Sequence, residues 1–183
     1  MPFKKIVEDR MRRGPILKRL REQFFKASTK ILDAVDFEGA LKGDLKNAKK
    51  LVVIASPFLS KQKVSRFLSF KEVGEGIEKG VKFIVITRPA DKKEVGDPKE
   101  HEECVQMLKE KGIRVVEQPR LHFKCVIVDE SIIYHLGSIN PLSIMPVSYV
   151  PPDYMVRFES EALVDEIIEN VIGREEYEHW TKE

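Results

Sequence analysis

Three short hydrophobic runs recur along the first two thirds of the chain, and a segment with helical spacing of apolar residues precedes each one. The runs are residues 51–56, 81–87 and 113–118. Continuous apolar runs of this length are typical of strands that are buried on both faces. The expected helices are residues 37–49, 61–79 and 99–111. We expect the second helix to break near Gly74 and Gly76, since glycine weakens helices. The repeated helix-to-strand unit predicts an α/β fold, with helices flanking a mixed, mostly parallel central sheet.

The pattern changes after residue 120. Two apolar runs, at about 121–128 and 132–136, follow each other closely, with Glu130 and Ser131 between them. Such spacing predicts a tight hairpin. A last strand is expected over residues 154–159, followed by an acidic helix over 161–172 that Gly173 ends.

The N-terminal part differs in charge from the rest. Its apolar residues recur at helical spacing, which predicts a basic amphipathic helix. They are Ile16, Leu20, Phe24, Ile31 and Val35. Residues 1–50 contain 14 Lys and Arg against 7 Asp and Glu, whereas residues 159–183 contain 2 against 9. We therefore expect a basic helical extension over residues 1–36 and a catalytic domain over 37–183 with an acidic C-terminal helix. The basic part suits a polyanion, although a solvated helix face explains it equally well.

Composition narrows the class of protein. With 183 residues, 42% hydrophobic and 34% charged, the chain suits one soluble globular domain. Cys104 and Cys125 fit neither a disulfide framework nor a zinc pattern. The sequence has no signal-peptide pattern and no run long and apolar enough to span a membrane, so we expect a cytoplasmic protein with no membrane partner.

The polar residues that matter most gather between positions 121 and 140. They are His122, Lys124, Asp129, Gly137, Ser138 and Asn140. In a strand over 121–128, side chains two residues apart share a face, so His122 and Lys124 would project together. By the same parity Asp129 would face the other way, which favours a structural role. An imidazole, an ammonium, a hydroxyl and an amide are thus available to one small anionic group.

This arrangement, His-x-Lys, then Asp five residues after the lysine, then Gly-Ser-x-Asn, resembles the HKD motif of the phospholipase D superfamily. The resemblance implies the phospholipase D fold and a hydrolase acting on phosphodiester bonds. The segments SPF, TRP, RLHFKCVIVD, GSIN and MVRFES are similar to domains at the C-terminal end of archaeal and bacterial helicase-like proteins. A helicase is therefore one expected partner or parent protein.

Catalysis in this superfamily takes two HKD motifs that face each other, and this chain has one. The resemblance to single-motif, nuclease-like members implies a homodimer with one half-site per chain. His122 of one chain would be the nucleophile, and the second His122 the general acid and then the base. Lys124 and Asn140 would bind the phosphate oxygens, and Ser138 would orient the imidazole or the phosphate. Asp129 and Gly137 would be structural members of the motif.

Further residues complete the expected site. The resemblance implies a downstream carboxylate that orients the histidine, with Asp153 in the aligned position and Glu159 as the alternative. Arg88 and Arg120 follow predicted strands, at the end where α/β sheets place ligands, and are expected to bind substrate. Ser56, which ends the first predicted strand, is grouped with them.

These inferences lead to a metal-independent endonuclease that cleaves DNA, with RNA as an open substrate, through a covalent phosphohistidine. No cofactor is expected, because His-x-Lys sets one neutral ligand beside a cation that repels metals. Two alternatives stay open. One is a phosphodiesterase acting on phospholipids of the cardiolipin type, and the other is a non-catalytic module for nucleic-acid binding or dimerisation.

Overall fold

A computed structural model of the chain describes residues 19, 28–143 and 153–182. Its strands are β1 (Ser28–Asp33), β2 (Leu51–Ala55), β3 (Lys82–Thr87), β4 (Arg114–Glu117), β5 (Cys125–Val128), β6 (Ile132–His135) and β7 (Tyr154–Glu159). Its helices are α2 (Ala34–Asn47), α3 (Lys61–Leu68), α4 (Lys71–Glu78), α5 (Pro98–Glu110), α6 (Glu161–Ile167), the π-helix η1 (Ile168–Gly173) and α7 (Arg174–Thr181). None of these helices is long and apolar enough to cross a membrane.

The strands form one mixed sheet in the order β1-β7-β6-β5-β2-β3-β4. Strands β2, β3 and β4 are parallel, as the repeated helix-to-strand units predict. The other four pairings among the described strands are antiparallel, so the expectation of a mostly parallel sheet is wrong in this respect. Between β5 and β6 the backbone reverses at Asp129 and Glu130, both with positive φ. So short a connection permits only antiparallel pairing, because a parallel crossover needs a dozen residues or more.

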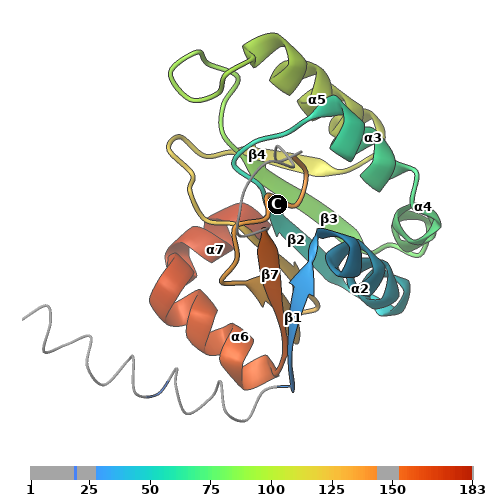
Figure 1. Ribbon diagram of the computed structural model, residues 1–183, viewed down its shortest axis with the longest axis vertical. Coiled ribbons are helices and arrows are strands. Elements are labelled where there is room, and N and C mark those ends of the chain that lie inside the picture. The colour runs from blue at the N-terminus through green and yellow to red at the C-terminus, as the bar shows by residue number, and fades with distance from the viewer. Residues whose placement is uncertain (1–18, 20–27, 144–152, 183) are drawn as a thin grey trace, which may run out of the picture.

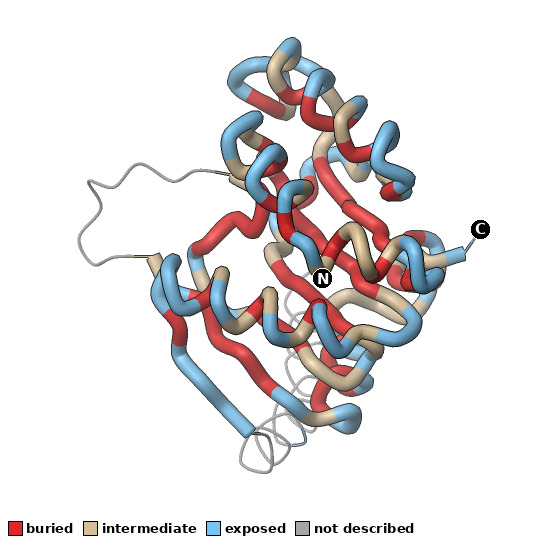
Figure 2. The backbone as a smooth tube through the Cα atoms, turned by 90° about the vertical axis from the view of Figure 1, so that its right-hand side faces the viewer, coloured by how far each residue is buried: buried red, intermediate tan, exposed pale blue. Residues whose placement is uncertain are grey.

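Helices cover both faces of the sheet, giving three layers (Figure 1). Alternate strand residues face opposite sides, so the sheet builds two separate cores. One core joins strand residues such as Ile54 and Val85 to α2, α3, α4 and α5. The other joins neighbours such as Val53 and Ile84 to α6, η1 and α7. Figure 2 shows the buried backbone concentrated in the strands and on the inner sides of the helices.

Strand β1 corrects the expected N-terminal helix. The helical spacing of Ile31 and Val35 suggested one continuous helix, but residues 28–33 pair along their whole length with β7. The carboxylate of Asp33 then accepts hydrogen bonds from the backbone N–H groups of Val35 and Asp36 and so begins α2. Because β1 belongs to the sheet, residues 28–36 lie in the same domain as the other strands, while Ile16, Leu20 and Phe24 of the expected helix lie outside the described residues.

The break between α3 and α4 also differs from the expectation. The helices separate at Ser69 and Phe70, where the Phe70 ring turns into the core and meets Phe67 edge to face. Gly76 lies inside α4, where a Cβ atom would stand 3.0 Å from the Phe83 ring. This glycine therefore allows close packing of α4 against β3 and does not end a helix.

Candidate active site

One edge of the sheet collects the candidate functional residues. Strands β2, β3, β4 and β6 end there, and β5 and β7 begin there, because antiparallel neighbours run in opposite directions. We call it the catalytic edge. The residues that follow or precede these strand ends are Ser56, Arg88, Arg120, His122, Lys124, Ser138, Asn140 and Asp153. Positions up to 97 residues apart in the sequence thus meet at one end of the sheet.

His122 and Lys124 lie just outside the sheet, which corrects the strand expected over 121–128. Strand β5 begins at Cys125, which pairs with Ala55, the last residue of β2. On the other side the pairing of β5 with β6 starts at Val126. Residues 121–124 extend past the ends of β2 and β6, so they have no neighbouring strand to pair with. His122 is therefore exposed, and Lys124 is half-buried.

Side chains hold the backbone of this segment in place of the ladder. The Nε of Arg88 donates to the Leu121 carbonyl at 2.7 Å. The Nζ of Lys124 donates to the His122 carbonyl at 3.2 Å. The Nδ1 of His135 lies 2.9 Å from the Lys124 carbonyl and, as the only possible donor, carries the proton. Three carbonyls in four consecutive residues thus have a side-chain donor.

The electrostatic setting of Lys124 is cationic. Burial lowers the pKa of Lys124 below its ordinary value, and the positive charge of Arg88 lowers this pKa further. A cluster of cations with partly excluded water favours an anionic group, since the low dielectric strengthens attraction as well as repulsion. The setting therefore suits a phosphate.

Hydrogen bonds join the segment after β6 to the start of β7. The Ser138 N–H donates to the Tyr154 carbonyl at 3.0 Å, and the Tyr154 N–H donates to the Ser138 hydroxyl at 3.4 Å. At Gly137 a Cβ atom would stand 2.0 Å from the same Tyr154 carbonyl, so only glycine fits. Asn140 follows in a buried position. Glycine therefore brings Ser138 and Asn140 to the catalytic edge.

Ser56 is a correction to the expected substrate contacts. It is fully buried, and its hydroxyl donates to the Phe58 carbonyl at 2.8 Å and accepts from the Leu142 N–H at 3.1 Å. With no exposed surface it cannot meet a substrate. It ties the end of β2 to the segment that contains Asn140.

The two arginines that were expected to bind substrate occupy different settings. The Arg88 side chain is only 19% exposed. Besides its bond to Leu121, it donates to the Glu94 carbonyl at 3.0 Å and lies 4.8 Å from the centre of the Phe58 ring. Arg120 is exposed and has a positive φ of 57°, and its N–H donates to the Glu94 carboxylate at 2.8 Å. Only Arg120 presents its side chain to solvent.

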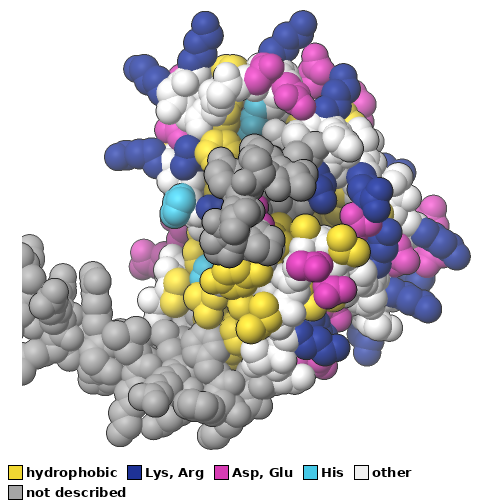
Figure 3. Space-filling view, in the orientation of Figure 1, with side chains coloured by type: hydrophobic (Ala, Val, Ile, Leu, Met, Phe, Trp, Pro, Cys, Tyr) yellow, Lys and Arg dark blue, Asp and Glu magenta, His cyan; other side chains and the backbone are white. Residues whose placement is uncertain are grey.

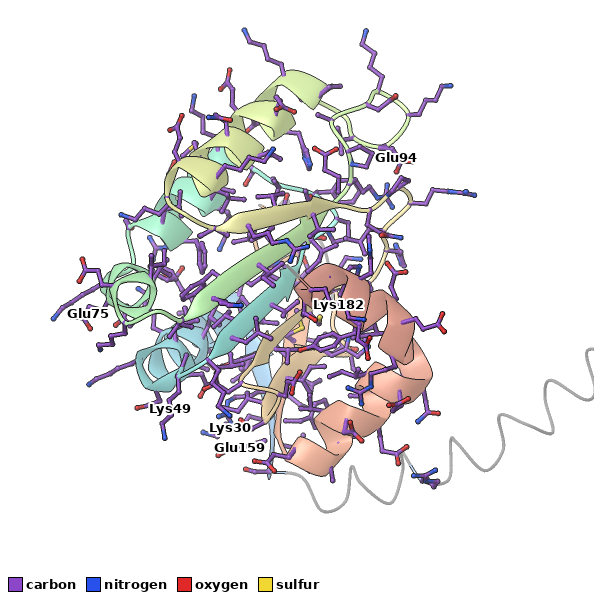
Figure 4. All side chains as sticks on the ribbon, turned by 180° about the vertical axis from the view of Figure 1, so that it is seen from behind. Lys30, Lys49, Glu75, Glu94, Glu159 and Lys182 are labelled. Atoms are coloured by element: carbon purple, nitrogen blue, oxygen red, sulfur yellow. The ribbon has the colours of Figure 1, made fainter. Side chains whose placement is uncertain are left out.

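Of the two carboxylates considered for orienting the histidine, only Asp153 lies at the catalytic edge. Asp153 immediately precedes β7, whereas Glu159 ends this strand and pairs with Ile132 at the other end of β6. Tyr154 and Glu159 are five residue steps apart along the strand, or about 17 Å. Figure 4 shows Glu159 at the opposite end of the molecule from Glu94, which contacts the catalytic edge through Arg120. Glu159 is therefore excluded, and its carboxylate accepts from Arg157 at 3.0 Å.

The aspartate of the motif lies at that opposite end. The Asp129 carboxylate accepts hydrogen bonds from the backbone N–H groups of Lys49, Lys50 and Leu51 at 2.7, 2.8 and 2.9 Å. It caps the start of β2 and is remote from His122. Two shallow hollows of about 290 and 330 Å³ flank Asp129, so they too are remote from the candidate site.

Comparison with known families identifies the class of protein. The model of the family "Cardiolipin synthase, PLD-like domain" matches residues 41–144, more than half of the chain. The chain therefore belongs to the phospholipase D superfamily, and this membership supports a hydrolase that acts on phosphodiester bonds. A search of curated protein sequences found no match.

Solved structures agree on the fold. Nuc from Salmonella typhimurium, a phospholipase D family member, has a TM-score of 0.59 at 13% identity, covering 82% of this chain and 94% of Nuc. NucT from Helicobacter pylori has a TM-score of 0.60 at 12% identity, covering 84% of this chain and 95% of NucT. The archaeal chromatin protein TrmBL2 has a TM-score of 0.51 at 14% identity, covering 99% of this chain and 64% of TrmBL2. The expected α/β class and phospholipase D fold are confirmed.

Proposed function

We propose that this protein is a metal-independent endonuclease that cleaves DNA through a covalent phosphohistidine at a site shared by two chains. One observation carries the proposal: an exposed His122 lies at the same sheet edge as Lys124, Ser138 and Asn140, and the motif occurs once. This edge offers a nucleophile and groups that bind phosphate oxygens. It offers no second motif histidine to protonate a leaving group.

The chemistry takes two steps. A nitrogen of His122 attacks phosphorus and forms a P–N bond, while the P–O bond to the leaving nucleotide breaks and that oxygen takes a proton from the other chain's His122. The same imidazole, now neutral, removes a proton from water, which attacks phosphorus and breaks the P–N bond. Lys124 stabilises the negative charge on the phosphate oxygens. Asn140, which is buried, binds a phosphate oxygen from the inner side of the site. Ser138 orients the phosphate.

The remaining expected roles follow from position. Asp153, which is half-buried at the start of β7, orients the imidazole of His122. Arg120, whose side chain is exposed beside the segment that contains His122, binds a flanking phosphate of the polymer. Neither role involves a metal or another cofactor.

An apolar surface beside the catalytic edge supports the dimer. Leu136 and Tyr154 are each 47% exposed, and both adjoin the Gly137–Ser138 segment. Ile31, 75% exposed, lies on the neighbouring edge strand, where it pairs with Val156. Figure 3 shows hydrophobic side chains gathered on this face of the molecule. Apolar surface of this kind suits a protein interface, and a second copy seated there would bring its own edge close to His122.

Two other functions have specific support. The matching family model is described as a cardiolipin synthase domain, which favours a phospholipid as the phosphodiester. The structure of TrmBL2, an archaeal chromatin protein with a novel mode of DNA binding, covers nearly the whole chain, which favours a module that binds DNA without cleaving it. We place cleavage first because His122 is exposed among its partner groups.

A single panel of assays separates the three functions. The full chain is incubated in EDTA with labelled single-stranded DNA, duplex DNA, RNA and cardiolipin vesicles, beside a His122→Asn control. We expect DNA cleavage, together with a labelled protein adduct that is stable in alkali and labile in acid. Cleavage of lipid alone would favour the phospholipase, and binding without cleavage would favour the non-catalytic module. Cleavage that is lost in EDTA and restored by magnesium would contradict the mechanism.

A further inference from the structure

We propose that Arg88 and His135 are positioning residues that clamp the backbone on both sides of His122 and thereby hold its imidazole for attack. The proposal rests on the proposed function, because the clamp matters for catalysis only if His122 is the nucleophile. The sequence assigned neither residue this role. Arg88 was expected to contact substrate.

The clamp follows from the position of the segment. Residues in the middle of a sheet are fixed by ladder hydrogen bonds on both sides, but residues 121–124 extend past the ends of β2 and β6. Without other restraints, such a segment would be free to move relative to the sheet. Side chains beside two strand ends donate to the segment: Arg88, which follows β3, at 2.7 Å and His135, the last residue of β6, at 2.9 Å.

Arg88 secures the N-terminal side. It follows β3, donates from Nε to the Leu121 carbonyl and from Nη1 to the Glu94 carbonyl, and lies against the face of Phe58. The Glu94 carboxylate also lies 3.9 Å from the Arg88 Nε and accepts from the Arg120 N–H. The planar guanidinium is thus fixed by contacts to three segments. Because it donates to the Leu121 carbonyl, it restrains the backbone just before His122.

His135 secures the C-terminal side. It is the last residue of β6 and half-buried, with its ring centre 4.3 Å from that of Phe123 and an angle of 32° between the ring planes. The ring therefore contacts the residue between His122 and Lys124 while Nδ1 donates to the Lys124 carbonyl. Burial lowers the pKa of His135, which favours a neutral ring with its one proton on Nδ1.

Kinetics can distinguish a positioning role of Arg88 and His135 from direct contact with substrate. We compare Arg88→Met and His135→Phe, which remove the donors, with His135→Asn, whose amide can replace Nδ1–H. Both donor-removing variants should lower kcat by about 10- to 100-fold with KM nearly unchanged, because misplacement of the nucleophile slows the chemical step. His135→Asn should recover most of the loss. Arg66→Met, which removes a surface ion pair to Glu38 on another part of the molecule, is the matched control and should have wild-type kcat.

Arg120→Gln distinguishes positioning from phosphate binding. Loss of a phosphate contact should raise KM and reduce the salt slope of DNA binding by about one. If Arg88→Met instead shows this signature with kcat unchanged, Arg88 binds substrate and the clamp is wrong. Thermal unfolding of each variant identifies any global loss of structure, and Arg88→Lys then serves as the milder substitution.

An NMR measurement tests the clamp without activity. Backbone ¹⁵N order parameters of residues 122–124 should fall in Arg88→Met and His135→Phe and stay unchanged in Arg66→Met. Unchanged order parameters in both donor-removing variants would overturn the clamp even in a protein that cleaves DNA. If the wild-type chain cleaves no phosphodiester but the order parameters of the two donor-removing variants fall as expected, the proposed function is overturned and the backbone restraint is established.

Discussion

Asp129 and Leu51 hold each other by two hydrogen bonds. The Asp129 N–H donates to the Leu51 carbonyl at 2.8 Å, and the Leu51 N–H donates to the Asp129 carboxylate at 2.9 Å. The same carboxylate caps Lys49 and Lys50. The aspartate of the motif thus joins the end of β5 to the start of β2, at the end of the sheet opposite His122.

Asp129→Ala should therefore destabilise the fold by about 2–3 kcal/mol. It leaves three backbone N–H groups without their acceptor and places alanine at a φ of 50°, which alanine disfavours. Asp129→Asn keeps one acceptor and tolerates this φ, so we expect a smaller loss. Chemical denaturation measures both variants. Asp165→Ala, which removes an exposed pair with Arg174, should cost under about 1 kcal/mol. A similar small cost at Asp129 would contradict the capping role.

Gly137→Ala should destabilise the protein strongly, by about 2–4 kcal/mol, since the new Cβ atom would collide with the Tyr154 carbonyl and force two backbone segments apart. Gly43→Ala is a control with the opposite sign. No atom lies within 4 Å of a Cβ at this exposed position in α2, and alanine should stabilise the helix by about 0.5–1 kcal/mol. Unfolding curves that place Gly137→Ala at or above wild type would exclude the close approach.

Acid should weaken the fold near neutral pH through His101. This residue is 2% exposed and lies 2.8 Å from the Arg88 carbonyl, and burial lowers its pKa below the ordinary 6.5. The unfolded chain therefore binds a proton at a higher pH than the folded chain does. The stabilisation is complete above about pH 6.5 and is lost as the pH falls toward the folded pKa.

His101→Gln should reduce this loss. Melting temperatures between pH 8 and pH 5 should fall less steeply in the variant than in wild type. The pKa of His135 is also lowered, so melting temperatures of a variant with both His101→Gln and His135→Asn should depend on pH even less. His179→Gln, at an exposed position in α7, is the control. Parallel curves for wild type and His101→Gln would show that His101 does not titrate in this way.

The shared site can be tested by mixing chains. If both His122 side chains serve one reaction, a dimer with one His122→Ala chain is inactive. After random exchange, activity should then rise with the square of the wild-type fraction. His179→Ala chains mixed in the same way should cause no loss. A linear dependence on the His122→Ala mixture would mean that each chain has its own complete site.

Some features followed from local sequence alone. The apolar runs predicted β2 and β3, and the segment over 154–159 coincides with β7. These strands were predictable because a strand buried along its length needs apolar residues at successive positions. The spacing of His122, Lys124 and the Gly-Ser-x-Asn segment identified the superfamily. The resemblance also implied a structural role for Gly137, but the reason, a close approach to the Tyr154 carbonyl, came only from the structure.

Other features depended on where neighbouring strands end. His122 and Lys124 leave the sheet because β2 stops at Ala55, and no property of residues 121–124 themselves marks this limit. Residues 28–33 form a strand because β7 offers a free edge, although the spacing of Ile31 and Val35 equally suits a helix.

The sequence by itself determined which chemical groups this protein has, and in which short segments they occur. The tertiary structure decided which of them meet. It buried Ser56, placed the start of β7 and not Glu159 at the edge that contains His122, and directed the Arg88 side chain from solvent toward the Leu121 carbonyl. The physical reason is that burial and hydrogen bonding at a strand end depend on partners distant in the sequence, which the residue type at one position cannot encode.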